Sequence, residues 1–156
     1  MFEQRVNQLI RDLDLAPHPE GGYYSEYYRS SQQISASIGP RACSTAIYFL
    51  LAREEVSKFH RLNSDEIWHF YEGTSLYLHT LGDDGLDLTV LGEGGFPNAV
   101  VPAGTWIAAE VPQPEGYALV GCTVSPGFEF EDFELAERAA LLREFPDYGN
   151  IIEKLT

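Results

Sequence analysis

The sequence predicts a mainly β fold, an antiparallel sandwich or jelly roll with a short helix near each end. Three observations predict it. Short apolar runs recur along most of the chain, turn residues separate them at regular intervals, and helical spacing of apolar residues is confined to the two ends. A length of 156 residues suits one domain with its own core, which we expect to span residues 1–156.

The first element is a helix, because four apolar residues recur on one helical face: Val6, Leu9, Ile10 and Leu13. Pro17 ends it. Eight later segments have the β-branched, aromatic or alternating pattern of strands. They are residues 23–29, 42–51, 67–70, 76–81, 86–91, 99–101, 106–111 and 117–124.

Two further patterns complete the prediction. Gly82-Asp83-Asp84-Gly85 is a strong hairpin signal between two of the strands. A second helix is predicted over residues 135–145, ended by Pro146. Just before it, Phe128, Phe130 and Phe133 alternate with acidic residues, and we interpret them as packing against this helix.

Charge and cysteine content narrow the function classes. With 24 Asp and Glu against 10 Lys and Arg, the net charge of −14 repels nucleic acid and anionic membrane surfaces. The N-terminus lacks a basic start before an apolar run, and no stretch approaches the ~20 apolar residues of a membrane span. Cys43 and Cys122 lie in apolar runs, typical of buried thiols in a reducing compartment. We therefore expect a cytoplasmic protein.

One segment carries the most information about function. His60, Glu66 and Gly73 match the spacing of the first sequence motif of the cupins, but Leu62 stands at the second histidine position. The turn Pro102-Ala103-Gly104 resembles the second cupin motif, with Ile107 at its histidine position.

The chain as a whole resembles the fifth cupin family, a domain of unknown function. Five strings carry this likeness in order along the chain: residues 18–24, 28–30, 44–51, 65–69 and 126–135. The resemblance implies a double-stranded β-helix, the jelly-roll barrel of RmlC-like cupins, and a homodimer. It implies no settled reaction.

The same resemblance weakens the expectation of a metal cofactor. A transition-metal site for oxygen chemistry needs at least two imidazoles and a carboxylate on one face. Aliphatic Leu62 and Ile107 have no lone pairs, so we predict no metal ligands and no firmly bound cofactor, and at most a weakly bound divalent metal. His79 is the one residue that would replace a lost ligand if its side chain turned inward, although a surface position is the commoner place for such a histidine.

His60 and Glu66 are the predicted catalytic residues. A carboxylate beside an imidazole fixes its tautomer and raises its basicity, which suits proton abstraction. The alternative is a plain hydrogen bond between two polar groups in the barrel mouth. Because side chains alternate along a strand, Glu66 and Trp68 share one face, which predicts that Trp68 is a wall of the cavity and His69 faces away.

Four other residues complete the predicted ligand site. Glu20 and Arg29 flank a tyrosine-rich segment at the barrel mouth, and Arg29 suits a forked contact with a small anion. Tyr24 and Tyr48 lie on predicted strands, either as ligand contacts or as aromatic packing.

Two function classes follow. The first is a metal-free isomerase or epimerase that acts on a small polar metabolite with His60 as base. The second is a cupin that binds a small ligand without turning it over. A metal-dependent oxygenase is a distant third, because of Leu62 and Ile107.

Overall fold

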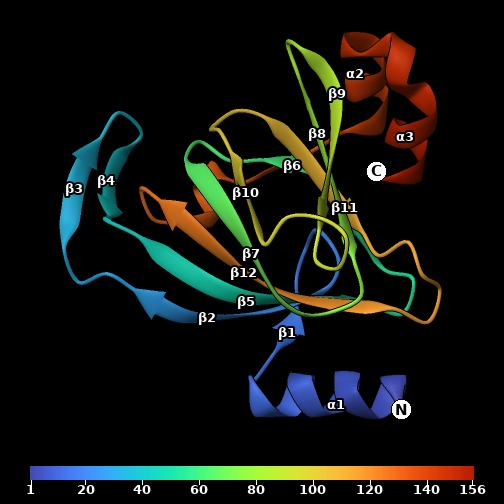
Figure 1. The fold of residues 1–156 in the computed structure, drawn as a ribbon. Coiled ribbons are helices and arrows are strands. Elements are labelled where there is room, and N and C mark those ends of the chain that lie inside the picture. Colours follow the sequence, from blue (N-terminus) through green and yellow to red (C-terminus); the bar gives the residue numbers. More distant parts are fainter.

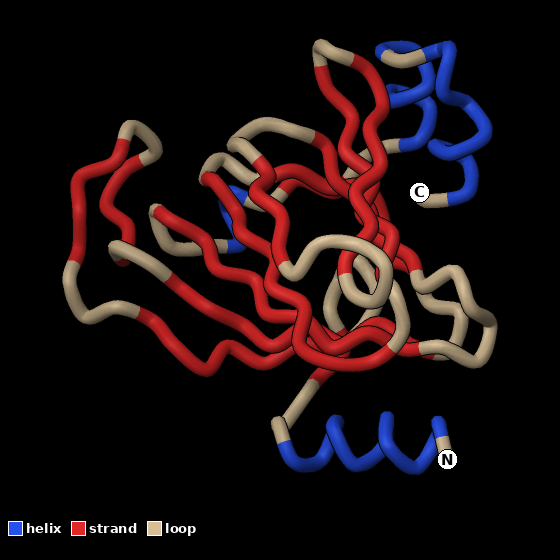
Figure 2. Tube along the Cα trace, viewed as in Figure 1, coloured by secondary structure: helices blue, strands red, loops and turns tan.

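A computed structural model describes residues 1–156 and has two facing antiparallel sheets (Figures 1 and 2). The six-stranded sheet has the order β1-β2-β5-β12-β7-β10, and the five-stranded sheet the order β13-β6-β11-β8-β9. A third sheet consists only of the hairpin β3-β4, which projects from the body as an arm (Figure 1). The predicted jelly-roll arrangement with terminal helices is confirmed.

The elements follow one another as short strands between terminal helices. Their bounds are α1 Phe2–Asp12, β1 Ala16–Pro17, β2 Tyr23–Arg29, β3 Gln33–Ala36, β4 Gly39–Ala42, β5 Thr45–Ala52, β6 Val56–Arg61, β7 Asp65–Gly73, β8 Leu76–Gly82, β9 Gly85–Leu91, β10 Asn98–Val101, β11 Trp106–Glu110, β12 Tyr117–Ser125, a 3₁₀ turn Phe130–Asp132, β13 Glu134–Leu135, α2 Arg138–Glu144, a 3₁₀ turn Pro146–Tyr148 and α3 Gly149–Lys154.

Each of the eight predicted strands overlaps a strand of the structure, but β6 and the arm were missed. Strand β6 was missed because polar Ser57 and His60 occupy buried positions, so no apolar alternation marks it. The arm was missed because β3 is mostly exposed, so its sequence lacks the apolar alternation that marks a strand packed on a core.

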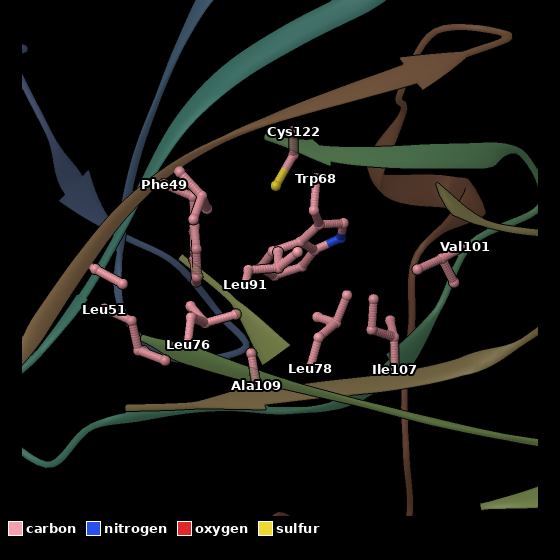
Figure 3. Packing of buried hydrophobic residues seen from close by; sticks show 12 residues of the cluster. Phe49, Leu51, Trp68, Leu76, Leu78, Leu91, Val101, Ile107, Ala109 and Cys122 are labelled. Atoms are coloured by element: carbon pink, nitrogen blue, oxygen red, sulfur yellow. The ribbon is translucent and has the colours of Figure 1, made fainter. Parts of the chain in front are cut away.

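The main core fills the space between the two sheets (Figure 3). The indole of Trp68 lies at its centre among Phe49, Leu78 and Leu91, and Trp68 is only 1% exposed. Its ring meets that of Phe49 edge to face, with 5.7 Å between centroids. Trp68 therefore points into the barrel, as the strand alternation predicts, but it is part of the packed core.

Helices cover the outer faces of the two sheets. On the six-stranded sheet, α1 buries Val6 and Leu9 against β5 and β12. Arg5 donates two hydrogen bonds to Glu72 (2.7 and 2.6 Å), and the Tyr117 hydroxyl donates a third (2.8 Å), which ties α1 to this face.

The C-terminal helices cover the five-stranded sheet. Leu141, Ile152 and Leu155 pack there against Phe59 and Trp106. None of the helices has both the length and the apolar character that crossing a membrane requires.

The C-terminal prediction needs two corrections. The helix begins at Arg138 because the Glu137 side chain caps it, accepting hydrogen bonds from two backbone N–H groups (3.1 and 2.8 Å), and Leu135 pairs with His60 in β13. Helix α3, beyond Pro146, was missed. Phe128, Phe130 and Phe133 do not pack on the helices but belong to residues 126–135, here called the closing segment, which lies over the barrel mouth.

Two glycines permit close backbone approaches that shape the site. Gly21 has φ of +107°, and a β-carbon there would collide with the carbonyl of Val56, so only glycine lets the chain after Glu20 pass against β6. Gly73, the glycine of the cupin-like motif, has φ of +113° and lies equally close to the carbonyl of Tyr117.

Because Trp68 is a core residue, Trp68→Ala should lower the free energy of unfolding by about 3–5 kcal/mol through lost burial and the cavity left behind. Chemical denaturation of the purified protein measures this. Leu88→Ala, at a position 46% exposed, is the control and should change stability by about 0.5 kcal/mol or less. A loss below about 1 kcal/mol for Trp68→Ala would contradict the packing assigned to it.

Candidate functional site

A cavity of about 140 Å³ opens between the sheets beneath the closing segment. Its lining comes from the β1-β2 connection, from strands β2, β5, β6, β7 and β12, and from the closing segment. The lining residues are His18, Glu20, Tyr24, Glu26, Arg29, Thr45, Ile47, Phe49, His60, Leu62, Glu66, Cys122, Val124, Phe128, Glu129, Phe130 and Phe133.

A buried carboxyl-imidazole contact lies in the cavity wall. Nε2 of His60 is 3.2 Å from Oε2 of Glu20, and both side chains are buried. Ser57 donates a hydrogen bond to the other Glu20 oxygen (2.8 Å). The carboxylate next to His60 is thus Glu20, which lies 40 residues before it, whereas the sequence pairs His60 with Glu66.

Hydrogen bonds assign the tautomers of both histidines. Nδ1 of His60 donates to the carbonyl of Lys58 (2.7 Å), so a neutral ring presents the Nε2 lone pair to Glu20. Nδ1 of His18 accepts from the backbone N–H of Glu20 (3.2 Å) and also lies 3.5 Å from Glu20 Oε2. His18 therefore does order its turn, as its place beside Pro19 suggests, and it also reaches the cavity.

Burial controls protonation in this cluster. Desolvation raises the pKa of Glu20 to about 8, against the opposing hydrogen bond from Ser57. Desolvation lowers the pKa of His60, although nearby Glu66 raises it, and lowers that of His18 to about 4. At neutral pH the Glu20 carboxyl therefore keeps its proton and donates a hydrogen bond to Nε2 of His60.

Glu66 is the one carboxyl of the cavity with a buried oxygen that has no hydrogen-bond partner in the protein. The residue is 6% exposed, and the unpaired oxygen is Oε2. Burial raises its pKa to about 7, His60 lowers it and Glu20 raises it further. Cys122 lies beside Glu66, and burial raises the pKa of this thiol well above its usual value, so it stays protonated. Glu66 can thus accept or release a proton near neutral pH.

Aromatic rings also line the cavity. Phe133 stacks on the imidazole of His60 with 5.4 Å between centroids and 29° between planes. Phe128 and Phe130 meet each other edge to face at 5.0 Å, and the rings of His18 and Tyr24 do so at 4.5 Å. The cavity wall therefore combines acidic side chains with aromatic rings.

Ion pairs hold the closing segment in place over the mouth. Arg29 donates to Glu26 (2.8 and 2.9 Å), Glu129 (2.8 Å) and the carbonyl of Phe128 (2.9 Å). At the base of the arm, Arg41 makes a forked contact with Asp132 (2.7 and 2.8 Å), and both residues are buried. Arg61 pairs with Glu134 (2.7 Å).

Five of the seven predicted site residues line this cavity: Glu20, Tyr24, Arg29, His60 and Glu66. Trp68 does not, because its indole is taken up by the core deeper in the barrel. Tyr48 does not either, because it lies on the outer face of the six-stranded sheet, where its ring contacts those of Tyr27 (4.4 Å) and Tyr71 (6.3 Å). The structure therefore brings neither Trp68 nor Tyr48 to the cavity.

Several site residues were missed by sequence reasoning. Cys122 was interpreted as a buried structural thiol, and the three phenylalanines of the closing segment as packing for a helix. Their alternation with acidic residues was a usable signal, since the acids pair with arginines of other strands while the rings turn inward. Nothing in the sequence indicates which way the segment folds back.

The residues present do not fit a transition metal. Leu62 lines the cavity and Ile107 lies in the core at the two positions where the cupin motifs place histidines. No group of three or more His, Cys, Asp or Glu side chains is arranged to hold an ion. His79 lies elsewhere, bonded to Glu110 at 3.1 Å beneath Lys154 of α3, so it supplies no substitute ligand.

Comparison with known families identifies the chain. The sequence model described as the Cupin superfamily (DUF985) matches residues 7–136. The chain belongs to this family.

Its relatives in the DUF985 cupin family extend across very different organisms. It is similar to protein SO0799 from Shewanella oneidensis, whose crystal structure has a TM-score of 0.88, 41% identity and 96% coverage of both chains. It is also 31% identical to the uncharacterized yeast protein YML079W of Saccharomyces cerevisiae, over 81% of this chain and 73% of that protein.

Distant cupins share only the fold. Oxalate decarboxylase from Bacillus subtilis superimposes with a TM-score of 0.60 at 15% identity, and the match covers 94% of this chain but 38% of that enzyme. One study of that enzyme concerns its Mn(II) centers.

Stability of this protein should fall as the pH rises from 6.5 to 8. The Glu20 carboxyl ionises near pH 4.5 in the unfolded chain but keeps its proton to about pH 8 in the fold. The folded state holds more protons in that interval, so the free energy of unfolding decreases with rising pH, by about 1 kcal/mol per unit. Glu66 adds to the fall up to about pH 7. Below pH 6.5 the lowered pKa values of His18 and His60 act in the opposite direction.

Denaturation curves at several pH values test this. Glu20→Gln should flatten the decline. Glu72→Gln is the matched control, because Arg5 lowers the pKa of Glu72 and places its contribution below pH 4.5, so the slope from pH 6.5 to 8 should remain. A Glu20→Gln slope equal to that of the wild type would contradict a buried, protonated Glu20.

Proposed function

We propose that this protein binds a small polar metabolite in the cavity and transfers a proton on it, as a metal-free isomerase or epimerase does. The observation that carries the proposal is the buried Glu66 carboxyl in the cavity wall, whose Oε2 has no hydrogen-bond partner in the protein, whereas the neighbouring Glu20 carboxyl contacts His60. A general acid or base works best when its pKa lies near the working pH, and burial brings that of Glu66 to about 7.

The arrangement supports a division of roles. Glu66 removes a proton from a carbon next to a carbonyl, and the electron pair moves onto the carbonyl oxygen. The Glu20 carboxyl gives up its contact with Nε2 of His60 and delivers its proton to that oxygen, and the hydrogen bond from Ser57 stabilises the carboxylate that remains. Glu66 then returns the proton to the former carbonyl carbon while the Glu20 carboxylate takes the hydroxyl proton of the carbon that lost its hydrogen, which completes an isomerisation. An epimerisation needs instead a proton donor on the opposite face of the same carbon.

A non-catalytic binding cupin is the second candidate. Phe133 covers the His60 ring, and Glu20 occupies its Nε2. These contacts hold the imidazole in place, which suits a binding site better than a reaction in which His60 has to move. In this case Glu66 would only accept a hydrogen bond from the ligand.

Deuterium exchange separates the two candidates. The protein is incubated in D₂O with a panel of small metabolites that carry a C–H next to a carbonyl, half of them amines and half alcohols, and proton NMR follows loss of that signal. We expect exchange of at least one compound. Glu66→Gln and His60→Asn should slow it by about 10²-fold or more, because the first removes the base and the second removes the side chain that positions the acid Glu20.

Tyr48→Phe is the control and should leave the exchange rate unchanged, since Tyr48 lies outside the cavity. Binding without exchange across the panel would favour the non-catalytic cupin. Equal exchange by wild type and both cavity variants would remove Glu66 and His60 from the mechanism.

We also propose that the chain forms a homodimer through the outer face of the six-stranded sheet. Helix α1 covers only part of that face, and beside it Tyr27, Tyr28 and Tyr71 are 50%, 51% and 47% exposed. Exposed aromatic residues gathered on one sheet are typical of a protein interface.

Light scattering at low micromolar concentration should give twice the chain mass of 17.5 kDa. Tyr71→Glu should shift the protein toward monomer, because it places a charge in the centre of the proposed contact. Leu88→Glu, an equal change on an exposed residue of the other sheet, is the control. A mass of one chain at all concentrations, or a dimer indifferent to Tyr71→Glu, would contradict this interface.

A further inference from the structure

We propose that the ligand of this cavity is a small organic cation, an ammonium group carried on a compact apolar ring or chain. This inference rests on the proposed function only in assuming that the cavity binds a small molecule. It names a charge class that the fold and the family leave open.

The charges of the lining argue against an anion. Four glutamates line the cavity, Glu20, Glu26, Glu66 and Glu129, against one arginine. That arginine, Arg29, is already engaged with Glu26, Glu129 and the carbonyl of Phe128, so it has little capacity left to bind a carboxylate or phosphate. The net charge of −14 also attracts cations toward the mouth.

An unpaired carboxyl oxygen in the cavity wall favours a ligand with a hydrogen-bond donor. Glu66 lines the cavity and is 6% exposed, and its buried Oε2 has no hydrogen-bond partner in the protein. A buried carboxyl oxygen without a hydrogen bond is costly, and an ammonium group supplies both N–H donors and the opposite charge. Glu20, whose Oε2 contacts His60 and His18, adds a second acidic group to the same wall.

The aromatic rings of the cavity suit the same ligand. Ring faces attract cations, and closely spaced aromatic side chains are a recurrent way to bind alkylammonium groups. Here Phe128, Phe130 and Phe133 line the cavity from the closing segment, and Tyr24 lines it from β2. Carboxyl groups and aromatic rings in one cavity match the ammonium group and the apolar body of such an amine.

A polyhydroxyl compound fits less well. Nine of the 17 lining residues are hydrophobic. A molecule with hydroxyl groups on every side would therefore have several hydroxyl groups without hydrogen-bond partners in this cavity. A ligand with its polar group at one end avoids this loss. The cavity of about 140 Å³ restricts it to a compact body.

Three probes of nearly equal shape test the charge class: benzylamine, benzyl alcohol and benzoate. Their binding to the full-length protein is measured by calorimetry at neutral pH in buffers of different ionisation enthalpy. Benzylamine should bind at least about tenfold more tightly than benzyl alcohol, and benzoate weakest of all. Benzylamine binding should also release protons from the protein, since a cation beside Glu66 and Glu20 favours their ionised forms.

Glu66→Gln should reduce the preference for amine over alcohol by about tenfold while leaving the affinity for the alcohol nearly unchanged. Glu115→Gln, the same loss of charge at an exposed residue outside the cavity, is the matched control and should keep the preference. This pair separates a direct contact from the general field of an acidic protein.

Tighter or equal binding of benzyl alcohol or benzoate would overturn the cationic class. Failure of all three probes to bind would overturn it as well. Neither result overturns the proposed function, whose own test is the deuterium exchange of the metabolite panel and the response of that exchange to Glu66→Gln.

Discussion

Burial of ionisable groups inside an apolar barrel is the constraint on which the rest of this site depends. Two carboxyls and two imidazoles lie where water cannot solvate their charged forms, so desolvation raises the pKa of Glu20 and Glu66 and lowers that of His18 and His60. The fold satisfies most of these groups internally, with Ser57, the Lys58 carbonyl and the Glu20 backbone as partners. Glu66 differs from these groups because its Oε2 has no hydrogen-bond partner in the protein. The other three side chains are held by structural hydrogen bonds, whereas Glu66 is free to react or to bind a ligand.

The closing segment makes that burial possible. Without it the barrel mouth would admit water, and the phenylalanine rings that cover His60 would be absent. Three arginines from separate elements, Arg29, Arg41 and Arg61, bind acidic residues of this one segment. Only the Arg41-Asp132 pair is buried, and breaking one partner of such a pair costs far more than breaking an exposed pair. The same pairing uses up the positive charge near the mouth, which leaves the cavity acidic.

Membership of the cupin family therefore predicts the fold of this chain but not a metal site. This chain keeps the double-stranded β-helix and the motif positions of cupins, yet two of those positions hold leucine and isoleucine. The lost imidazoles are not replaced by new ligands. Instead Glu20, supplied by the connection between β1 and β2, approaches His60 from outside the motif and turns a place for metal ligands into a carboxyl-imidazole pair.

The sequence by itself determined the jelly-roll class, the terminal helices, most strands and the candidates His60, Glu66, Glu20, Tyr24 and Arg29, because alternation, turn residues and motif spacing are local properties. Only the tertiary structure decided which carboxyl contacts His60, since the β1-β2 connection that carries Glu20 passes against β6, where the backbone N–H of Lys58 donates to the carbonyl of Glu20. Alternation correctly turned Trp68 inward, but an inward residue can lie in the core or in the cavity, and depth along the barrel has no local signal. The direction taken by the closing segment depends on Arg29, Arg41 and Arg61, whose partners lie 100, 91 and 73 residues away, and sequence spacing does not encode such contacts.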